Sequence, residues 1–124
     1  SVIFKLIRKL KVAGYRSAVI KRTDKAISSE PKDKDTFGFR AAGAKITSFA
    51  SMSETNFVLG KIIPTRKIVE IILNINEVDL IIVEGAMDKE IKKIRLGNIP
   101  LRENTIYDYK NGFENLYKTI LKMI

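Results

Sequence analysis

The run LIIV at residues 80–83 is the feature that most restricts how this chain can fold, because it is apolar at every position. A strand without polar alternation is typical of a parallel sheet that is covered on both faces. The run ends in Glu84 and Gly85, and ligands of parallel sheets bind outside the carboxyl ends of the strands. Glycine lets the backbone turn there without a side chain in the way. Glu84 is therefore either a ligand-binding acid or a solvated acid at a strand end, and this segment alone leaves both interpretations open.

The spacing of apolar residues predicts the other elements. Helices are predicted over residues 2–13, 35–43, 64–75 and 110–124, and strands over residues 15–21, 44–50, 55–59, 79–83 and 90–96. Asp35 or Thr36 is expected to cap the second helix, and Gly14 and Gly43 are expected just after helix ends. The polar residues between 22 and 34 predict a loop. Because strands alternate with helices, the sequence predicts one α/β domain over residues 1–124 with a mostly parallel sheet.

The composition excludes several kinds of chemistry. The chain has no histidine and no cysteine, which removes Ser-His-Asp catalysis, disulfides and thiolate metal sites. The excess of 23 Lys and Arg over 14 Asp and Glu gives a net charge of +9. This charge indicates either an anionic partner or a lysine-rich surface that serves solubility. We expect four lysines to lie on the solvated surface: Lys92, Lys93, Lys118 and Lys122.

Ser1 stands directly before an amphipathic helix, and a strand ending at Lys21 follows that helix. This order is typical of a P-loop protein just after its phosphate-binding loop, whose motif ends in a serine or threonine. The glycines and the lysine of that motif are absent from these residues. Considered alone, Ser1 is better explained as an ordinary helix N-cap.

Three blocks of the sequence, AGYRSAVIKRT, KDTFGFRAAGA and VDLIIVEGAMDKEIKKI, occur in an order that resembles the molybdopterin-guanine dinucleotide biosynthesis protein B (MobB) family. The tail IPLRENTIYDYKNGFENLYKTIL is also similar to the end of that family. The resemblance covers nearly the whole chain, and the second and third blocks together are its most specific part. It implies a P-loop NTPase-like, three-layer αβα fold whose first strand and Gly-rich phosphate loop lie before residue 1.

The resemblance also implies a function. Members of the family bind GTP with Mg²⁺, hydrolyse it weakly at best and form homodimers. They assist the molybdenum cofactor guanylyltransferase, the enzyme that attaches GMP to molybdopterin. A cytoplasmic protein without a membrane partner and without specific binding to nucleic acid is expected on this basis.

Residues in the first and last of these blocks match the nucleotide site of the family. Ser1 matches the hydroxyl positions that end the phosphate loop, where it would touch an α-phosphate or, with a shift of one residue, Mg²⁺. Lys21 would face the phosphates, and Arg22 stands where the family usually has histidine. Arginine supplies charge but stays protonated and cannot shuttle protons. Glu84 would anchor Mg²⁺ through water or orient the attacking water as the catalytic acid, and Gly85 would bring the backbone close to the nucleotide.

Two residues of the middle block also match charged positions of the family. Asp35 could hold Mg²⁺ directly or through water, and its alternative is the N-cap of the short helix. Arg40 could bind a phosphate, including that of molybdopterin, in a bidentate manner, and its alternative is a surface ion pair. Asp79 stands at the opposite end of its strand from Glu84 and is expected to lie outside the site.

The sequence departs from the family in a second place besides the phosphate loop. Only Gly97 separates KKIRL from NIPL, where the family usually has a longer loop and another strand, so a segment near residue 97 is expected to be missing. No Asn-Lys-x-Asp guanine signature is present, which leaves the preferred base open. Two other functions stay open: a small P-loop kinase or related phosphotransferase, and a basic nucleic-acid-binding module.

Overall fold

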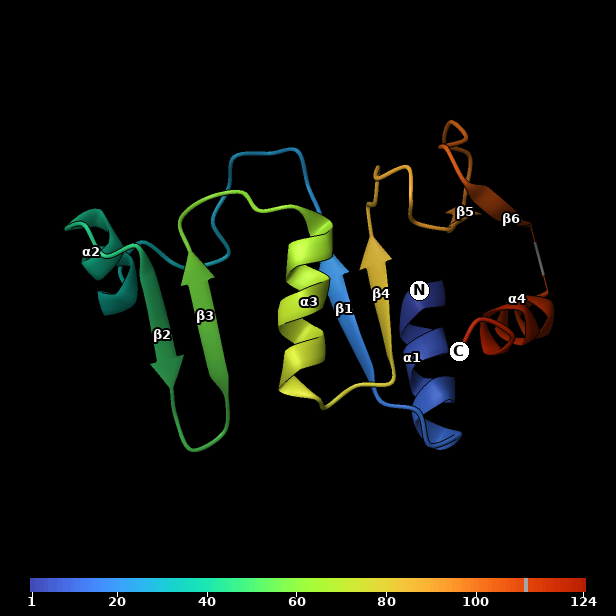
Figure 1. Ribbon diagram of the computed structural model, residues 1–124, viewed down its shortest axis with the longest axis horizontal. Helices are drawn as coiled ribbons and strands as arrows, with labels where there is room; N and C mark the ends of the chain where they lie inside the picture. The colour runs from blue at the N-terminus through green and yellow to red at the C-terminus, as the bar shows by residue number, and fades with distance from the viewer. Residues whose placement is uncertain (111) are drawn as a thin grey trace. The chain divides into compact units, whose positions relative to one another are not determined.

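The computed structural model describes residues 1–110 and 112–124, and it divides the chain into two compact units. Unit 1 contains residues 1–23 and 65–124, and unit 2 contains residues 24–64. The elements, labelled in Figure 1, are α1 (Val2–Val12), β1 (Ser17–Lys21), α2 (Asp35–Ala41), β2 (Ile46–Ala50), β3 (Thr55–Leu59), α3 (Thr65–Ile75), β4 (Leu80–Glu84), β5 (Lys93–Leu96), β6 (Thr105–Tyr109) and α4 (Phe113–Leu121). No helix within the described residues is both long enough and apolar enough to cross a bilayer.

Helix α1 begins and ends where its sequence predicts. The Ser1 Oγ accepts a hydrogen bond of 3.3 Å from the Phe4 amide, which caps the amino end of the helix. Gly14 follows the last turn with a φ of +92°, a conformation that glycine adopts without strain. Leu6 and Leu10 are buried on one face of the helix. Leu6 and Leu10 belong to the hydrophobic core of unit 1.

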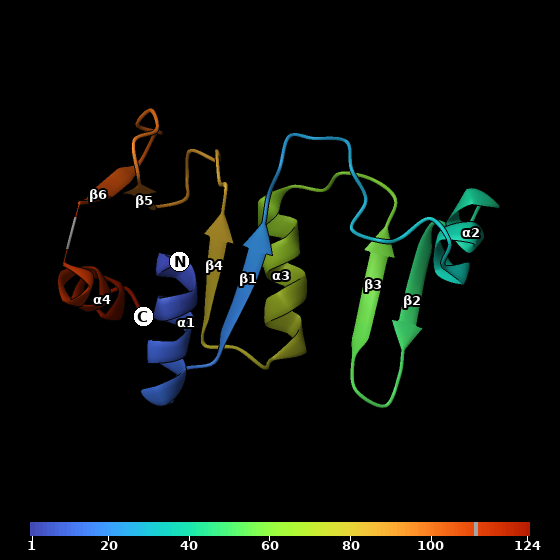
Figure 2. The same cartoon turned by 180° about the vertical axis from the view of Figure 1, so that it is seen from behind.

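The centre of unit 1 is a parallel pair of strands. β1 pairs with β4 in a register that runs from Ser17 opposite Leu80 to Lys21 opposite Glu84. Leu80 and Ile82 pack against a core formed by Leu6, Leu10 and Tyr117, so α1 and α4 both cover this part of β4. Helix α3 runs beside β1 in both views (Figures 1 and 2). The predicted strand at residues 79–83 is therefore confirmed within one residue.

The burial of β4 differs from the sequence-based expectation. Residues Leu80–Val83 are only half-buried, although an all-apolar run predicts a strand covered on every side. The reason is that β4 has a strand on one edge only among the described residues, namely β1. Residues of β4 and β5 line a cavity of about 740 Å³. The sequence of β4 is thus that of an internal strand, but within residues 1–110 and 112–124 only β1 pairs with it.

Strands β5 and β6 form a second parallel pair in unit 1. β6 was not predicted as a strand. The expectation for Lys93 was wrong, since this residue is only 8% exposed. Its ammonium group donates to the carbonyl oxygens of Asp88, Ile91 and Glu103. These three carbonyl oxygens accept from all three N–H groups of the lysine, which offsets the desolvation cost of burying its charge.

Helix α4 is shorter than predicted. It covers Phe113–Leu121, whereas the periodicity predicts a helix over residues 110–124. Lys110 follows β6, and Asn111 lies outside the described residues. The ring of Tyr117 stacks on that of Phe113 with centroids 6.4 Å apart, and Lys9 of α1 forms an ion pair with Glu114. These contacts join the first and last helices of the chain.

The Arg95–Asp108 pair joins β5 to β6 and leads to a prediction about acid stability. Arg95 donates from Nε and Nη2 to the two carboxylate oxygens over 3.1 and 2.5 Å. The hydrogen bond from Arg95, helped by Lys110, lowers the pKa of Asp108 to about 2 from its usual 3.8. Because the folded pKa lies below the unfolded one, the pair stabilises the fold fully above pH ~4 and loses this contribution as the pH falls towards ~2.

We therefore expect Asp108→Asn to lower the urea midpoint of the intact protein at pH 7, with the difference from wild type shrinking between pH ~4 and ~2. Equilibrium urea unfolding at several pH values measures this. Asp33→Asn, which removes an exposed carboxylate of unit 2, is the matched control. A difference between Asp108→Asn and wild type that stays constant across this range would contradict the assignment.

Unit 2 consists of a loop, a short helix and an antiparallel hairpin. β2 pairs with β3 from Ile46 opposite Leu59 to Ala50 opposite Thr55. Gly43 follows α2 with a φ of +124°, as predicted for a residue that ends a helix. The expected side-chain cap of α2 was wrong: Lys34 holds the cap position, its side chain makes no capping bond, and Asp35 is the first helical residue.

Candidate functional site

Lys21 and Glu84 meet at the carboxyl ends of β1 and β4. They are opposite each other in the register of the two strands, and both are exposed. The Arg22 amide donates to the Glu84 carbonyl oxygen over 2.8 Å, so the pairing continues one residue beyond β1. A carboxylate, an ammonium and a guanidinium are therefore carried by adjacent chain segments at one end of the sheet. This is the end at which parallel sheets bind their ligands.

Gly85 gives this end of the sheet its shape. Its φ is +85°, in the left-handed region, and a Cβ at this position would lie 2.6 Å from the Arg22 carbonyl oxygen. That distance is too short for any Cβ, so only glycine lets the chain leave β4 so close to β1. The predicted turn at Gly85 thus has a structural reason. Its predicted contact with nucleotide stays a prediction.

The amino end of α1 lies at the same end of unit 1 as the arrowheads of β1 and β4 (Figures 1 and 2). Val2 and Ile3 of its first turn and Glu84 and Gly85 line the same cavity of about 740 Å³. The amino end of a helix offers unpaired N–H groups and a partial positive charge, both of which attract phosphate. Helix α1 has no acidic residue in its first turn that would neutralise this charge. The structure therefore brings Ser1, Lys21, Arg22 and Glu84 to one end of unit 1.

Two further groups at this end were missed by the sequence analysis. Arg102 donates from Nη1 to the Ala86 carbonyl oxygen over 3.0 Å and lines the cavity beside Glu84 and Gly85. Thr65, which is 1% exposed, donates to the Asp88 carboxylate over 3.1 Å and so ties the start of α3 to the loop after β4. The sequence carried no signal for either contact, because each joins segments that are distant along the chain and match no motif.

Asp79 lies where it was expected, away from Glu84. Its carboxylate accepts from the Arg16 amide over 2.7 Å and from the Arg16 guanidinium over 3.3 Å, at the amino ends of β1 and β4. This hydrogen-bonded partner lowers the pKa of Asp79. Asp79 therefore holds the start of the strand pair, at the opposite end of β4 from Glu84.

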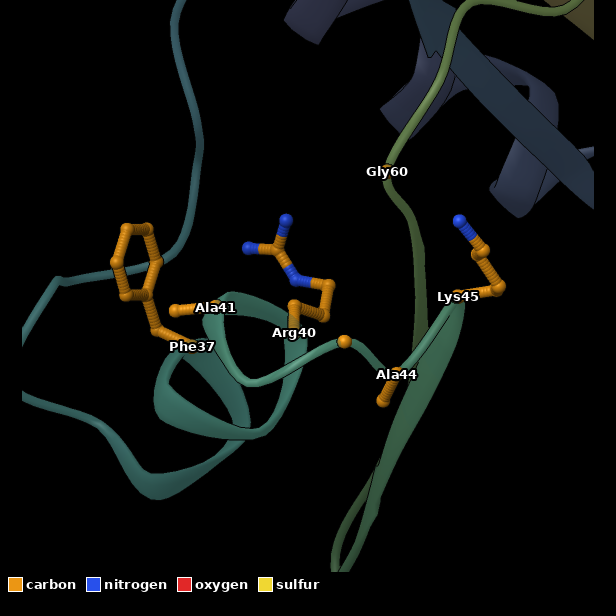
Figure 3. Close-up of a pocket in the computed structure, with 7 residues that line it drawn as sticks. Phe37, Arg40, Ala41, Ala44, Lys45 and Gly60 are labelled. Carbon is orange, nitrogen blue, oxygen red and sulfur yellow. The ribbon is translucent and has the colours of Figure 1, made fainter.

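The other two predicted residues, Asp35 and Arg40, belong to unit 2. Asp35 opens α2 and is exposed. Arg40 is held inside unit 2: its Nη2 donates to Glu30 over 2.7 Å, and its Cζ lies 5.3 Å from the centroid of the Phe37 ring (Figure 3). Glu30 also accepts from the Thr36 hydroxyl. Within unit 2, the carboxylate of Asp35 is therefore not part of the network that surrounds Arg40.

The oxygen atoms at this end of unit 1 include possible ligands for a metal ion. No group of three or more acidic side chains that could hold a metal occurs among them. Mg²⁺ does not need such a group, because it keeps several waters and commonly takes one or two carboxylates together with phosphate oxygens. The hydroxyl of Ser1 and the carboxylate of Glu84 are hard oxygen donors of the kind that Mg²⁺ prefers. These residues fit a phosphate-bound Mg²⁺ and do not form a free-standing metal cage.

The parallel strand pairs and the helices around them are consistent with a P-loop NTPase-like α/β fold. Residues 1–115 match the family of molybdopterin guanine dinucleotide synthesis protein B. The chain belongs to this family, which supports a role in molybdenum cofactor biosynthesis and in nucleotide binding. The resemblance seen in the sequence is thereby confirmed.

Solved structures agree with this assignment. A crystal structure of Bacillus subtilis MobB superimposes with a TM-score of 0.66 at 12% identity, covering 99% of this chain and 88% of that one. A second structure of Bacillus subtilis MobB gives 0.64 at 12% identity, with 99% and 87% covered. A crystal structure of molybdopterin-guanine biosynthesis protein B gives 0.63 at 19% identity, with 99% and 90% covered. These neighbours show the fold. Among curated proteins, none matches the sequence at a significant level.

Proposed function

We propose that the protein is a GTP-binding accessory protein that assists the attachment of GMP to molybdopterin and is at most a weak GTPase. The observation that carries this proposal is the position of Glu84 opposite Lys21, at the end of unit 1 where α1 begins. Cationic groups suit phosphates, and a carboxylate suits a phosphate-bound metal. Membership of the family supports a role in molybdenum cofactor biosynthesis. The binding of GTP and the guanylyltransferase partner are part of what we propose.

The open edge of β4 supports the proposed phosphate loop. The cavity between β4 and β5 is lined by backbone segments at residues 80–85 and 93–96 and by the first turn of α1. An unpaired strand edge inside a sheet is costly, because its N–H and C=O groups have no protein partner. We propose that one more parallel strand fills this slot and leads through a Gly-rich loop to Ser1.

Each side chain at this end has a role in the proposal. Lys21 and Arg22 would stabilise the negative charge of the phosphates, Ser1 would donate to an α-phosphate or hold Mg²⁺, and Glu84 would hold Mg²⁺ through water. Bound Mg²⁺ would neutralise phosphate charge. Hydrolysis is slow in this proposal, because Arg22 replaces a group that could exchange protons. Gly85 lets the backbone approach the nucleotide.

Unit 2 supports the proposal that the protein forms a homodimer. The β2–β3 hairpin exposes large apolar side chains, with Phe57 71% and Phe49 49% exposed. A two-stranded hairpin is marginally stable by itself, and exposed apolar patches commonly mark interaction surfaces. The apolar segment at residues 55–63 can be an interface strand or an ordinary core strand. The exposure of Phe57 favours the interface.

Glu84→Gln in the intact protein tests the nucleotide site. We expect the Kd for GTP in the presence of Mg²⁺ to rise about tenfold or more, because a carboxylate that supports a bound metal is worth a factor of this size. The melting temperature should stay nearly unchanged, since the Glu84 side chain is exposed. Isothermal titration with GTP, with and without Mg²⁺, measures the effect.

Glu77→Gln is the matched control, because Glu77 is also exposed but precedes β4 and so lies towards its opposite end. It should bind GTP as wild type does. Equal GTP affinity of Glu84→Gln and wild type in Mg²⁺ would remove Glu84 from the site.

A further inference from the structure

The loop after β4 is held at several points along its length. It covers residues 85–92 and leads from Glu84 to Lys93, the first residue of β5. Figure 1 shows it running from the arrowhead of β4 towards β5. Surface loops are usually mobile, because few of their backbone groups have partners inside the protein. In this loop the Asp88 and Ile91 carbonyl oxygens share one partner, the ammonium group of Lys93.

Lys93 joins this loop to a second chain segment. Its ammonium group donates to the Ile91 carbonyl oxygen over 3.0 Å and to the Glu103 carbonyl oxygen over 2.7 Å, and its third acceptor is the Asp88 carbonyl oxygen. Glu103 lies in the segment that precedes β6. Lys93 is only 8% exposed, so the desolvation cost of its charge is offset only when these hydrogen bonds form. The lysine therefore favours one arrangement of the two segments.

Two more side chains hold the same loop. Arg102, next to Glu103, donates from Nη1 to the Ala86 carbonyl oxygen over 3.0 Å. The hydroxyl of Thr65, at the start of α3, donates to the Asp88 carboxylate over 3.1 Å. Ala86 is itself buried, with 6% of its surface exposed. The loop is thus fixed from three directions: the start of α3, the start of β5 and the segment before β6.

The first residues of the loop form the turn that carries Glu84. The Glu84 carbonyl oxygen accepts from the Arg22 amide over 2.8 Å, which fixes the Glu84 backbone from the side of β1. Gly85 is the only residue between Glu84 and the buried Ala86, so the loop fixes the same backbone from the other side. A loop that lost its arrangement would release one of these two constraints, and the Glu84 carboxylate would then lose its fixed direction.

We infer that Lys93 is a positioning residue, which gathers the loop after β4 and the segment before β6 and so fixes the turn at Glu84 and Gly85. Its consequence for GTP rests on the proposed function, in which the Glu84 carboxylate supports Mg²⁺ through water. Lys93 acts here through Glu84 and contacts neither phosphate nor metal. Removal of residues that orient the groups around a metal commonly lowers metal affinity by about 10- to 100-fold.

Hydrogen exchange of the intact protein without GTP tests whether Lys93 fixes the turn. The Arg22 amide reports on the Glu84 carbonyl oxygen, and the Ile91 amide, which donates to the Asp88 carbonyl oxygen over 3.4 Å, reports on the loop. We expect both amides to exchange about tenfold faster in Lys93→Met, because local opening no longer breaks the hydrogen bonds of the ammonium group. Unchanged exchange at both amides in the folded variant would overturn the inference.

Two controls separate this local effect from a general loss of stability. The Asp79 amide donates to the Arg16 carbonyl oxygen over 2.8 Å at the opposite end of β4, and it should exchange in Lys93→Met as it does in wild type. Lys92→Met removes the exposed neighbouring lysine and should change none of these rates by more than about twofold. Equal acceleration of the Asp79 and Arg22 amides in Lys93→Met would mean general destabilisation and would also overturn the inference.

GTP titration with Mg²⁺ and with EDTA tests the effect on the proposed site. Lys93→Met should raise the Kd for GTP about tenfold in Mg²⁺. Without Mg²⁺ the Kd should change less than about twofold, because the cationic side chains of Lys21 and Arg22 are still present. A lysine that serves stability alone would change both Kd values by the same factor. Faster exchange in the loop with an unchanged ratio of the two Kd values would overturn the positioning role.

Lys93→Gln provides a second variant in case Lys93→Met does not fold. The amide of glutamine still donates hydrogen bonds, so this variant should show the same pattern with smaller changes. Unchanged exchange of the Arg22 and Ile91 amides in Lys93→Gln would overturn the inference in the same way. If wild type binds no GTP, the proposed function is rejected, and the exchange rates at these two amides alone decide whether Lys93 fixes the turn. Failure of the inference and failure of the proposed function therefore give different results.

Discussion

Gly85→Ala is expected to lower the free energy of unfolding of the intact protein by about 2–4 kcal/mol, summed from a strained backbone conformation and a steric clash. At a φ of +85° an alanine is strained even in open space. Its Cβ would also lie 2.6 Å from the Arg22 carbonyl oxygen. The backbone cannot simply move away, because the Arg22 amide is hydrogen-bonded to the Glu84 carbonyl. Urea denaturation followed by circular dichroism measures the difference.

Gly97→Ala is the matched control for this substitution. Gly97 has a φ of +79°, almost the same as Gly85, but no atom lies within 4 Å of its added Cβ. It should therefore show only the conformational cost of about 1 kcal/mol. The difference between the two variants measures the clash with Arg22. An equal loss of free energy of unfolding in both variants would contradict the close approach of Gly85 to the Arg22 carbonyl oxygen.

The position of Gly85 also affects the proposed GTP site. A shift of the chain at Gly85 would move Glu84 and Arg22 together, because the two are joined by a backbone hydrogen bond. Gly85→Ala should thus reduce GTP binding even at temperatures where the variant is folded. This outcome would separate the geometry of the site from the charge of Glu84, which Glu84→Gln removes without moving the backbone.

Local sequence patterns predicted most of the elements of this fold. The helical spacing of Leu6 and Leu10 and the glycine at position 14 were sufficient for α1, and its boundaries are nearly those predicted. The all-apolar run at residues 80–83 identified β4 and the sheet end at Glu84. These signals depend on residues that are close in the sequence, where periodicity and turn chemistry act directly.

Features that depend on distant partners were not predictable in the same way. Lys93 is buried because three carbonyls from separate residues surround its ammonium group, and no local pattern distinguishes it from its exposed neighbour Lys92. Arg102 was missed because its partner is a backbone carbonyl at Ala86. The half-burial of β4 was missed because burial depends on whether a neighbouring strand is present.

The candidate site was predictable in part for the same reason. Glu84 and Lys21 could be placed together, since both end parallel strands and such ends meet at one edge of a sheet. The binding of nucleotide or metal by these residues does not follow from strand order and stays a prediction. Arg40 forms an ion pair with Glu30, but this pair is largely buried and does not lie at the surface. Phosphate binding by Arg40 stays a prediction.

The second large effect is expected at Leu10, a completely buried residue of α1 that belongs to the core shared with α4 and β4. Leu10→Ala should lower the free energy of unfolding of the intact protein by about 3 kcal/mol, from lost apolar burial and from the cavity left behind. Thermal and urea unfolding of wild type and variant measure the loss.

Val12→Ala is the control for Leu10→Ala, because Val12 lies on the same helix and is 90% exposed. It should change stability by less than about 0.5 kcal/mol. Leu10 lies more than two turns from Ser1, so the folded fraction of Leu10→Ala should still bind GTP with nearly the wild-type Kd, provided that α1 keeps its position. A large loss of GTP affinity in folded Leu10→Ala would instead show that the core under α1 sets the position of Ser1. Equal free energies of unfolding for Leu10→Ala and Val12→Ala would contradict the packing of α1 against Tyr117 and Ile82.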